Sequence, residues 1–293
     1  MSSNSVTLIV LNYNDSQTTV SYLNRIREYS SINRIVVVDN HSTDDSFLVL
    51  KNYENHKIRV IQTPYNGGYG YGNNFGIRYA NELDLPEYII ISNPDVIFDE
   101  KIIEEMIESI SEEEKYTCVA PMMLDVNGNK VNGTAWKVPT AFQYTVSSEV
   151  LINRFFTLNK YKSLKDSETK GSIEVECLAG SFFMVKTIDM LKYGMYDENM
   201  FLYCEETYLG LQMKKNNRQM LLLTDLSFVH AHGVSINKTY KSAIKKQWMV
   251  WKNKEYLMKN YMGCSRFNVF LSHAFFCLCS VEQYFLMLFH IGA

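Results

Sequence analysis

The sequence carries few features that would mark an exported, repetitive or nucleic-acid-binding protein. Its amino terminus lacks the charged and apolar regions of a signal peptide, and its six cysteines show no paired metal-binding spacing. Internal repeats and low-complexity segments are absent from the sequence. The formal net charge of −3 argues against the broad basic surface that nucleic-acid binding requires. We therefore expect a reduced, cytoplasmic protein without a nucleic-acid partner.

The composition is that of an ordinary globular protein. Hydrophobic residues make up 46% of the chain and charged residues 21%, which excludes a disordered or fibrous protein. A chain of 293 residues can form one large α/β domain with additions, or two modest domains.

Strand-like and helix-like segments alternate four times in the first 115 residues. Apolar runs at 6–12, 35–38, 59–62 and 88–92 have the length of strands. Each is followed by a segment with helical spacing: 16–29, 46–53, a helix that ends near residue 85, and 99–114. This alternation predicts a mainly parallel sheet covered by helices on both faces. Ligands of such sheets bind at the carboxyl ends of the strands.

The second half is less regular. Residues 128–139 indicate turns, 159–171 a polar surface loop and 174–186 an extended apolar segment. Lysines and aromatic residues alternate through 238–266, a mixture that suits an anionic membrane surface. Residues 267–293 are apolar but interrupted by polar residues, so they are a poor transmembrane candidate. They could lie in a membrane interface, pack on a partner subunit or form a core helix.

Two aspartates follow predicted strands. Asp39 could accept hydrogen bonds from a base or ribose, although Asp39 and Asn40 could equally begin a turn. Pro94 ends a strand ladder and sets Asp95 beyond it, so we expect Asp95 to be presented rather than buried. A carboxylate there could ligate Mg²⁺ or Mn²⁺, which would bridge diphosphate oxygens, or could simply belong to a turn.

A glycine-rich segment at 66–76 is expected to form a turn before a helix. Its backbone amides could approach phosphate or sugar closely. With Asp95 downstream it also resembles a dinucleotide-binding unit. The glycines lack the required register, however, and the turn at 12–15 has no glycine, so a dehydrogenase is disfavoured.

Two further clusters could supply catalytic or metal-binding groups. Glu205 or Glu206 could deprotonate a hydroxyl if its environment raises its pKa, although glutamates also commonly begin helices. His230 and His232 would point the same way from an extended segment, which makes a second metal ligand plausible. Such histidine pairs also occur on surfaces by chance.

In order along the chain, seven motifs resemble the family 2 inverting glycosyltransferases with a GT-A fold, particularly rhamnosyltransferase-like members that build bacterial surface polysaccharides. The resemblance covers roughly residues 6–253. The motifs are LIVLNYN, VVVDNHSTDDS, NGGYGYGNNFG, SNPDV, CLAGSFFMVK, FLYCEETYLGLQ and HAHGVS. The sequence departs from the family pattern in having Glu206 for an aspartate, and Tyr208 and Gln212 for another aspartate and an arginine.

The resemblance assigns roles to individual residues. Asp39 would contact the nucleobase, Asp95 would represent the acidic metal motif, and Glu206 would be the base, supported by Glu205. The expected nucleotide and donor site comprises Leu11, Asn12, Tyr13, Asp39, Asn66, Gly67, Gly68, Asn73, Asn93, Asp95 and Gly180. The acceptor would contact Trp136 and Tyr203, and the Mg²⁺ or Mn²⁺ ligands would be Asp95, His230 and His232.

The resemblance therefore implies a non-processive inverting hexosyltransferase, because the Q-x-x-R-W signature of processive synthases is absent. The donor would be a UDP- or dTDP-linked sugar and the acceptor a hydroxyl of a glycan, lipid-linked at the inner face of the membrane. A non-catalytic nucleotide-sugar or polysaccharide binding protein is the alternative. The expected division is a GT-A domain at 1–236, with a nucleotide half at 1–115 and an acceptor half at 116–236. A basic and aromatic helical extension at 237–293 would bind a membrane or form a homodimer.

Overall fold

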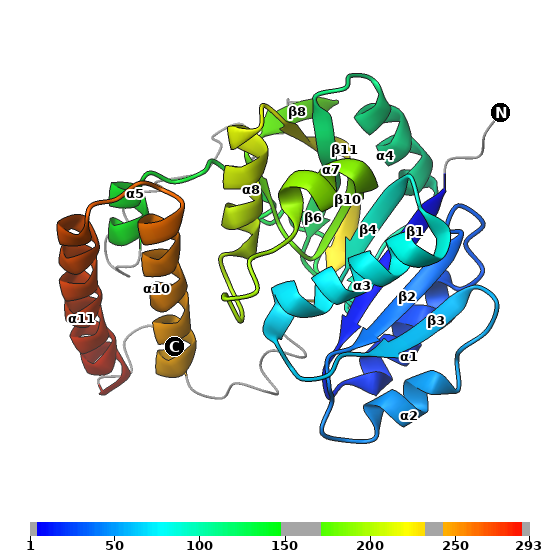
Figure 1. Ribbon diagram of the computed structural model, residues 1–293, viewed down its shortest axis with the longest axis horizontal. Helices are drawn as coiled ribbons and strands as arrows, with labels where there is room; N and C mark the ends of the chain where they lie inside the picture. The colour runs from blue at the N-terminus through cyan, green and yellow to red at the C-terminus, as the bar shows by residue number, and fades with distance from the viewer. Residues whose placement is uncertain (1–4, 148–170, 232–242, 289–293) are drawn as a thin grey trace.

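The computed structural model describes residues 5–147, 171–231 and 243–288 and has one large sheet with helices on both faces (Figure 1). The path of hydrogen-bonded strands runs β3-β2-β1-β4-β10-β6-β11-β5, and β8 pairs with β11. The strands of the first half are β1 (Val6–Asn12), β2 (Arg34–Asp39), β3 (Ile58–Gln62), β4 (Tyr88–Ser92) and β5 (Val96–Ile97). Those of the second half are β6 (Tyr116–Leu124), β8 (Ser172–Val175), β10 (Phe182–Lys186) and β11 (Gln219–His230).

The first four strands are parallel, as the alternation predicted. Successive side chains of a strand point to opposite faces, so both faces of β1 and β2 can be apolar. Leu8 and Val37 belong to the cluster on one face, whereas Ile9 and Val36 belong to the cluster on the other. These apolar runs therefore form the centre of a three-layer core.

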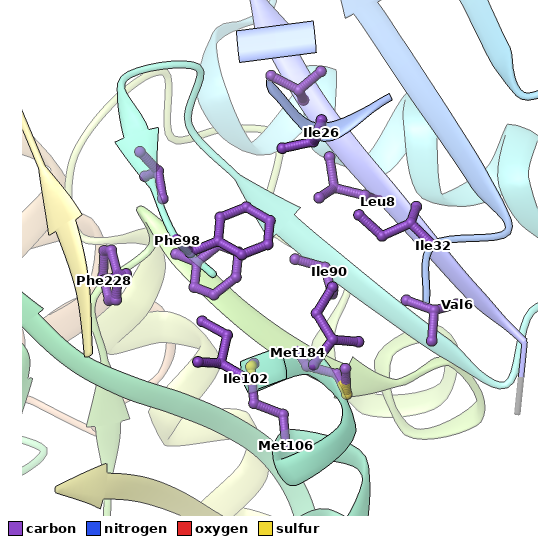
Figure 2. Packing of buried hydrophobic residues seen from close by; sticks show 14 of the residues in the cluster. Val6, Leu8, Ile26, Ile32, Ile90, Phe98, Ile102, Met106, Met184 and Phe228 are labelled. Atoms are coloured by element: carbon purple, nitrogen blue, oxygen red, sulfur yellow. The ribbon is translucent and has the colours of Figure 1, made fainter. Parts of the chain in front are cut away.

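Each face of the sheet is covered by its own set of helices. The first cluster includes residues of α1 (Ser16–Ile26), α2 (Ser46–Lys51) and α4 (Lys101–Ser111), and Figure 2 shows Ile26, Ile102 and Met106 packed near strand residues Leu8 and Ile90. The second cluster includes residues of α3 (Gly68–Asp84) and α8 (Glu205–Lys215). Between β10 and α8 the chain also forms α7 (Thr187–Asp189) and the π-helical turn η2 (Met190–Gly194).

The segment at 174–186 is strand-like, as expected, but it is divided among separate strands. The chain there forms β8, then β9 (Cys177–Leu178), then β10. β9 pairs with β7 (Ala135–Trp136) in a small second sheet, and β10 inserts antiparallel between β4 and β6. Because β10 runs against β4, the residues just before β10 lie at the carboxyl end of β4, beside the expected ligand-binding edge.

The expectation of a glycine-rich turn over 66–76 was wrong, because α3 begins at Gly68. A methyl group added at Gly72 would lie 2.4 Å from Leu11 Cδ1, and one at Gly76 would lie 2.7 Å from Val38 Cγ2. These two glycines let α3 approach β1 and β2 more closely than a residue with Cβ would allow. These close approaches give both glycines a role in helix–sheet packing.

The carboxyl-terminal part is helical, as expected, and its helices lie beside the sheet domain (Figure 1). It consists of α10 (Ala243–Asn260) and α11 (Arg266–Leu288), which pack with α5 (Ala141–Val146). Their apolar cluster includes Trp251 and Phe276, whose rings stack at 5.5 Å, and it extends to Met200 and Tyr208. Within the described ranges, no helix is long and apolar enough to span a membrane. The expected boundary at 236/237 lies outside the described residues and stays a prediction.

Candidate active site

The carboxyl ends of β1, β2 and β3 meet around the Asp39 carboxylate, which is fully buried. Its Oδ1 accepts hydrogen bonds from the Ser42 amide (3.0 Å) and Gln62 Nε2 (3.0 Å). Its Oδ2 accepts from Asn12 Nδ2 (2.9 Å) and the Ser42 hydroxyl (2.6 Å). Through these hydrogen bonds Asp39 links the ends of the three strands, and it begins the turn to Ser42. Its predicted contact with a nucleobase stays a prediction.

The start of α3 joins this edge through Asn40. The Asn40 amide donates to Asn66 Oδ1 (3.0 Å) and to the carbonyl of Gly68 (3.0 Å), while Gly68 N–H donates to Asn66 Oδ1 (3.1 Å). Asn66 and Gly68, with Gly67 between them, therefore lie near Asp39, as expected. The partly exposed Leu11 and Tyr13 flank buried Asn12 on β1 and the loop that follows.

Asn73 was also predicted to contact the donor. Its side chain is buried, and its Nδ2 donates to the carbonyl of Tyr69 (3.0 Å) one helical turn earlier. Its amide nitrogen therefore supports the start of α3, and its contact with the donor stays a prediction.

The structure brings Asp95 and His230 together although 135 residues separate them. Asp95 Oδ1 lies 3.1 Å from His230 Nε2, and β5 pairs with the end of β11. Asp95 is of intermediate exposure, and its side chain is 9% exposed, so the expectation that it is presented rather than buried holds only in part. Pairing of β5 with β11 covers it. His232 lies outside the described residues, and within them no three His, Cys, Asp or Glu side chains gather as a metal cluster.

A short chain of contacts leads from this pair to the two glutamates. Asn93 N–H donates to the carbonyl of Ser181 (2.8 Å), at the junction of β4 and β10. A Cβ placed on the adjacent Gly180 would lie 3.1 Å from Glu206 Oε1 and equally close to the Tyr69 hydroxyl. That hydroxyl donates to the carbonyl of Gly180 (2.6 Å). Gly180 thus leaves space beside Glu206, close to the carboxyl end of β4.

Glu205 and Glu206 begin α8 after a strained turn. Tyr203 has a φ of 76° and Cys204 a φ of 75°, a left-handed conformation that residues other than glycine rarely adopt. The first turn of a helix favours negative charge, so α8 can hold an ionised carboxylate at its amino terminus.

The two carboxyl groups have different surroundings. Glu205 is 2% exposed, and its Oε1 has no hydrogen-bond partner among the residues that the structure describes. Burial, together with the charge of Glu206, raises the pKa of Glu205 well above its ordinary value. Burial also raises the pKa of Glu206, but backbone amides including that of Gly180 oppose the rise. The pKa of Glu205 is raised further than that of Glu206, so Glu206 is the more readily ionised of the two.

The two residues expected to contact an acceptor both adjoin the start of α8. Trp136, on β7, donates its Nε1–H to Thr207 Oγ1 (3.4 Å), one residue after Glu206. Tyr203 lies in the strained turn itself. Both are partly exposed. The structure brings them to the glutamates, while contact with an acceptor stays a prediction.

Sequence reasoning missed Tyr69 and Asn253. Tyr69 lies beside Glu206 and was hidden within a motif interpreted through its glycines. Asn253 of α10 donates to the carbonyls of Leu202 (2.8 Å) and Tyr203 (2.9 Å). An asparagine within a basic helix carries no sequence signal for that contact.

The comparisons with known proteins identify the family. The model of "Glycosyl transferase family 2" matches residues 7–186. The chain belongs to glycosyl transferase family 2. The predicted family and the glycosyltransferase class are confirmed by this match, although Glu205, Glu206 and His230 lie beyond the matched segment.

Curated relatives of this family 2 member share about a quarter of its residues. The low-salt glycan biosynthesis hexosyltransferase Agl10 of Haloferax volcanii is 25% identical over 72% of this chain and 62% of its own. The rhamnosyltransferase WbbL of Escherichia coli K12 is 24% identical over 60% and 70%. An N-acetylglucosaminyl-diphospho-decaprenol L-rhamnosyltransferase of Mycobacterium tuberculosis is 25% identical over 62% and 61%. The chain thus spans less than two thirds of the first and third relatives.

Solved structures support the GT-A fold. GalNAc-T7 with UDP, GalNAc and Mn²⁺ has a TM-score of 0.57 at 14% identity, over 78% of this chain and 43% of its own. The mannosyltransferase PcManGT of Pyrobaculum calidifontis, in complex with GDP-Man and Mn²⁺, has a TM-score of 0.57 at 12% identity, over 94% and 70%. The predicted fold class, a mainly parallel sheet with a helical carboxyl-terminal part, is confirmed.

Proposed function

We propose that this chain is a non-processive inverting glycosyltransferase that moves a sugar from a UDP- or dTDP-linked donor to an acceptor hydroxyl, in bacterial surface polysaccharide synthesis. One observation carries the proposal: Glu206 lies beside Gly180 and Tyr69, next to the carboxyl end of β4. Asp95, which pairs with His230, follows the same strand in the sequence. The names of the relatives support a hexosyl or rhamnosyl donor.

The nucleotide would bind at the edge built from Asn12, Asp39 and Asn66 to Gly68. Ligands of open parallel sheets bind at the carboxyl ends of the strands, and these residues surround the ends of β1 and β2. Since all four hydrogen bonds to the Asp39 carboxylate come from neighbouring residues, we propose that a nucleobase would exchange with one of them, with Gln62 the most exposed donor.

Asp95 and His230 fit part of a divalent cation site. Their facing oxygen and nitrogen atoms are 3.1 Å apart, and Mg²⁺ is commonly held by one or two protein carboxylates together with substrate phosphates. We propose that these two residues hold Mg²⁺ or Mn²⁺ with the donor's diphosphate, and that His232 adds a ligand. A bound cation would offset the negative charge of the departing diphosphate. The Mn²⁺ in the two similar structures supports this assignment.

Glu206 would remove the proton of the acceptor hydroxyl. The oxygen of that hydroxyl forms a bond to the anomeric carbon as the bond from that carbon to the diphosphate oxygen breaks. Attack on the face opposite the leaving group inverts the anomeric configuration, so a covalent sugar–enzyme intermediate is not expected. With its pKa raised further, Glu205 would stay protonated and leave Glu206 as the single negative charge at the start of α8.

The acceptor would be lipid-linked. The chain would bind it while α11 lies on an anionic lipid surface. Exposed apolar residues recur along one stripe of α11: Phe267, Phe270, Leu271, Leu278 and Val281. Exposed Lys245, Lys252 and Lys259 recur every seven residues on α10, and exposed Arg266 begins α11. An apolar stripe accompanied by cations suits anionic lipid headgroups better than a second copy of the chain. The decaprenol named in the mycobacterial relative supports such an acceptor.

The test is a panel of UDP- and dTDP-sugars incubated with the full chain and Mn²⁺, with and without short glycan acceptors on a polyprenyl diphosphate. We expect release of nucleoside diphosphate and addition of one inverted sugar with one donor of the panel. Long products would refute non-processive transfer. Donor binding without any release of nucleoside diphosphate would favour the non-catalytic binding protein instead.

A further inference from the structure

Helix α10 holds the strained turn that precedes the two glutamates. The side chain of Asn253 is buried, and its Nδ2 donates to the carbonyls of both Leu202 (2.8 Å) and Tyr203 (2.9 Å). An amide nitrogen carries two hydrogens, so both are used by this turn. Cys204 also approaches α10, with its Sγ 3.9 Å from the carbonyl of Val250.

A second connection from the same region fixes the start of this loop. Asp197 accepts hydrogen bonds from the hydroxyls of Tyr256 (2.8 Å) and Tyr261 (2.5 Å). Burial raises the pKa of Asp197, but these hydroxyls and the groups of Asn199 outweigh it and hold the pKa below its ordinary value. Between the two connections, Met200 is fully buried in the cluster of α10 and α11. Residues 197–204 are therefore held at both ends by the carboxyl-terminal helices.

The left-handed backbone at Tyr203 and Cys204 requires outside support. Neither residue is glycine, and such conformations persist only where surrounding structure enforces them. The turn sets where α8 begins and therefore where the Glu206 carboxylate lies relative to Gly180. On the opposite side, Tyr69 N–H donates to the carbonyl of Phe201 (2.9 Å), so the loop is clamped between α3 and α10.

We infer that Asn253 is a positioning residue for the catalytic base, and that the carboxyl-terminal helix pair is part of the catalytic apparatus rather than only an attachment device. This inference rests on the proposed role of Glu206. It places a requirement for sugar transfer in α10, outside the segment 7–186 that the family model matches.

The test compares Asn253→Asp with Asn260→Asp in the full chain. Asn253→Asp keeps size and shape but replaces the two donated hydrogens by a charge facing two carbonyls. Asn260, at the end of the same helix, is exposed and donates to the Tyr256 carbonyl (2.9 Å) one turn earlier. Donor affinity, kcat, the pH dependence of kcat and hydrogen exchange at residues 197–208 are measured with Mn²⁺ and a donor and acceptor on which the wild-type chain is active.

We expect Asn253→Asp to lower kcat by about 10- to 100-fold, because a displaced catalytic group costs on that order. Donor affinity should stay within about twofold. The acid limb of the kcat profile should move to lower pH, since a loosened turn hydrates Glu206, and hydrogen exchange at 202–206 should increase. Asn260→Asp should match wild type in all four measurements. Tyr261→Phe, which removes one hydroxyl from Asp197, should increase exchange near residue 197 and keep the folded structure.

The outcomes separate this inference from the proposed base. If Asn253→Asp keeps wild-type kcat, pH profile and exchange, the positioning role is refuted whatever Glu206→Gln does. An unfolded Asn253→Asp combined with wild-type exchange and kcat in Tyr261→Phe would also refute it. If Glu206→Gln keeps turnover while Asn253→Asp loses it with increased exchange, the base assignment fails and the support of the turn by α10 stands.

Discussion

Replacing Glu205 and Glu206 in turn by glutamine distinguishes the proposed catalytic base from its neighbour. Glutamine resembles a protonated glutamic acid in shape, so the change matters only where the ionised form is needed. Glu206 can ionise beside the Gly180 amide, so Glu206→Gln removes the proposed base and should lower kcat by about 10²- to 10⁴-fold. The pKa of Glu205 is raised further, and in the proposed division of roles Glu205 is the protonated partner, so Glu205→Gln should keep kcat within about threefold of wild type.

The same pair predicts a pH dependence of stability with a definite sign. Burial raises the pKa of Glu205 in the folded chain above that in the unfolded chain, where it is about 4.3. Above that pH the unfolded chain releases a proton that the folded chain retains, so wild-type stability falls as pH rises towards the folded pKa. Each pH unit in this window costs about 1.4 kcal/mol. Glu205→Gln removes the cost, so its stability advantage should grow with pH.

The assay combines kcat measured from pH 5 to 9 with urea unfolding at pH 5, 6, 7 and 8. Wild-type kcat should fall as pH drops through the raised pKa of Glu206, and this acid limb should persist in Glu205→Gln. Equal loss of kcat in both variants, or a Glu205→Gln stability difference that does not change with pH, would refute the division into one ionised and one protonated carboxyl group.

Two further predictions concern the metal pair and the lipid surface. Asp95→Ala should lower kcat by at least ~10² and raise the Mn²⁺ concentration giving half-maximal rate, because one ionic ligand is lost; an unchanged Mn²⁺ titration would contradict this role. Phe270→Glu with Leu278→Glu should abolish sedimentation with vesicles containing anionic phosphatidylglycerol, whereas Leu48→Glu, also at an exposed apolar residue but on α2, should not. Binding that survives in the α11 variant, or that is equal with neutral vesicles, would refute the lipid surface.

The sequence predicted those elements whose burial appears as a regular apolar pattern within one segment. The strands at 6–12 and 88–92 were predictable because each is a continuous apolar run, as expected of a strand that is buried on both faces. The regular alternation of strand-like and helical segments along the chain supported the same prediction. The residues at or just beyond their carboxyl ends, among them Asn12 and Asn93, were therefore predicted to lie at one edge of the sheet. Glu206 was predicted only through its motif, because its approach to Gly180 depends on long-range packing.

Features set by long-range pairing escaped prediction. The antiparallel insertion of β10 depends on partners at both sides, β4 and β6, and no local pattern indicates strand direction. The hydrogen bond between Asp95 and His230 joins residues 135 positions apart. The resemblance had assigned both to one metal site, but no local pattern in the sequence indicates that they touch. Asn253 supports the turn at Tyr203 from 50 residues away. In each case the missing information is which distant segments lie together.

The glycines of α3 are compatible with two hypotheses, close helix–sheet packing and contact with a ligand. A pair of variants distinguishes them. A methyl group at Gly76 would lie 2.7 Å from Val38 Cγ2 and 2.9 Å from Ile9 Cγ2, both on buried strands. Gly76→Ala should therefore lower the free energy of unfolding by about 1–3 kcal/mol, although alanine favours helix by about 1 kcal/mol. Gly133→Ala is the matched control, because its nearest neighbouring atom would be 4.0 Å away, and its stability should change by less than about 0.5 kcal/mol. Urea unfolding measures both. A Gly76→Ala variant as stable as wild type would show that α3 does not need close approach to β1 and β2, and would restore ligand contact as the reason for this run of glycines.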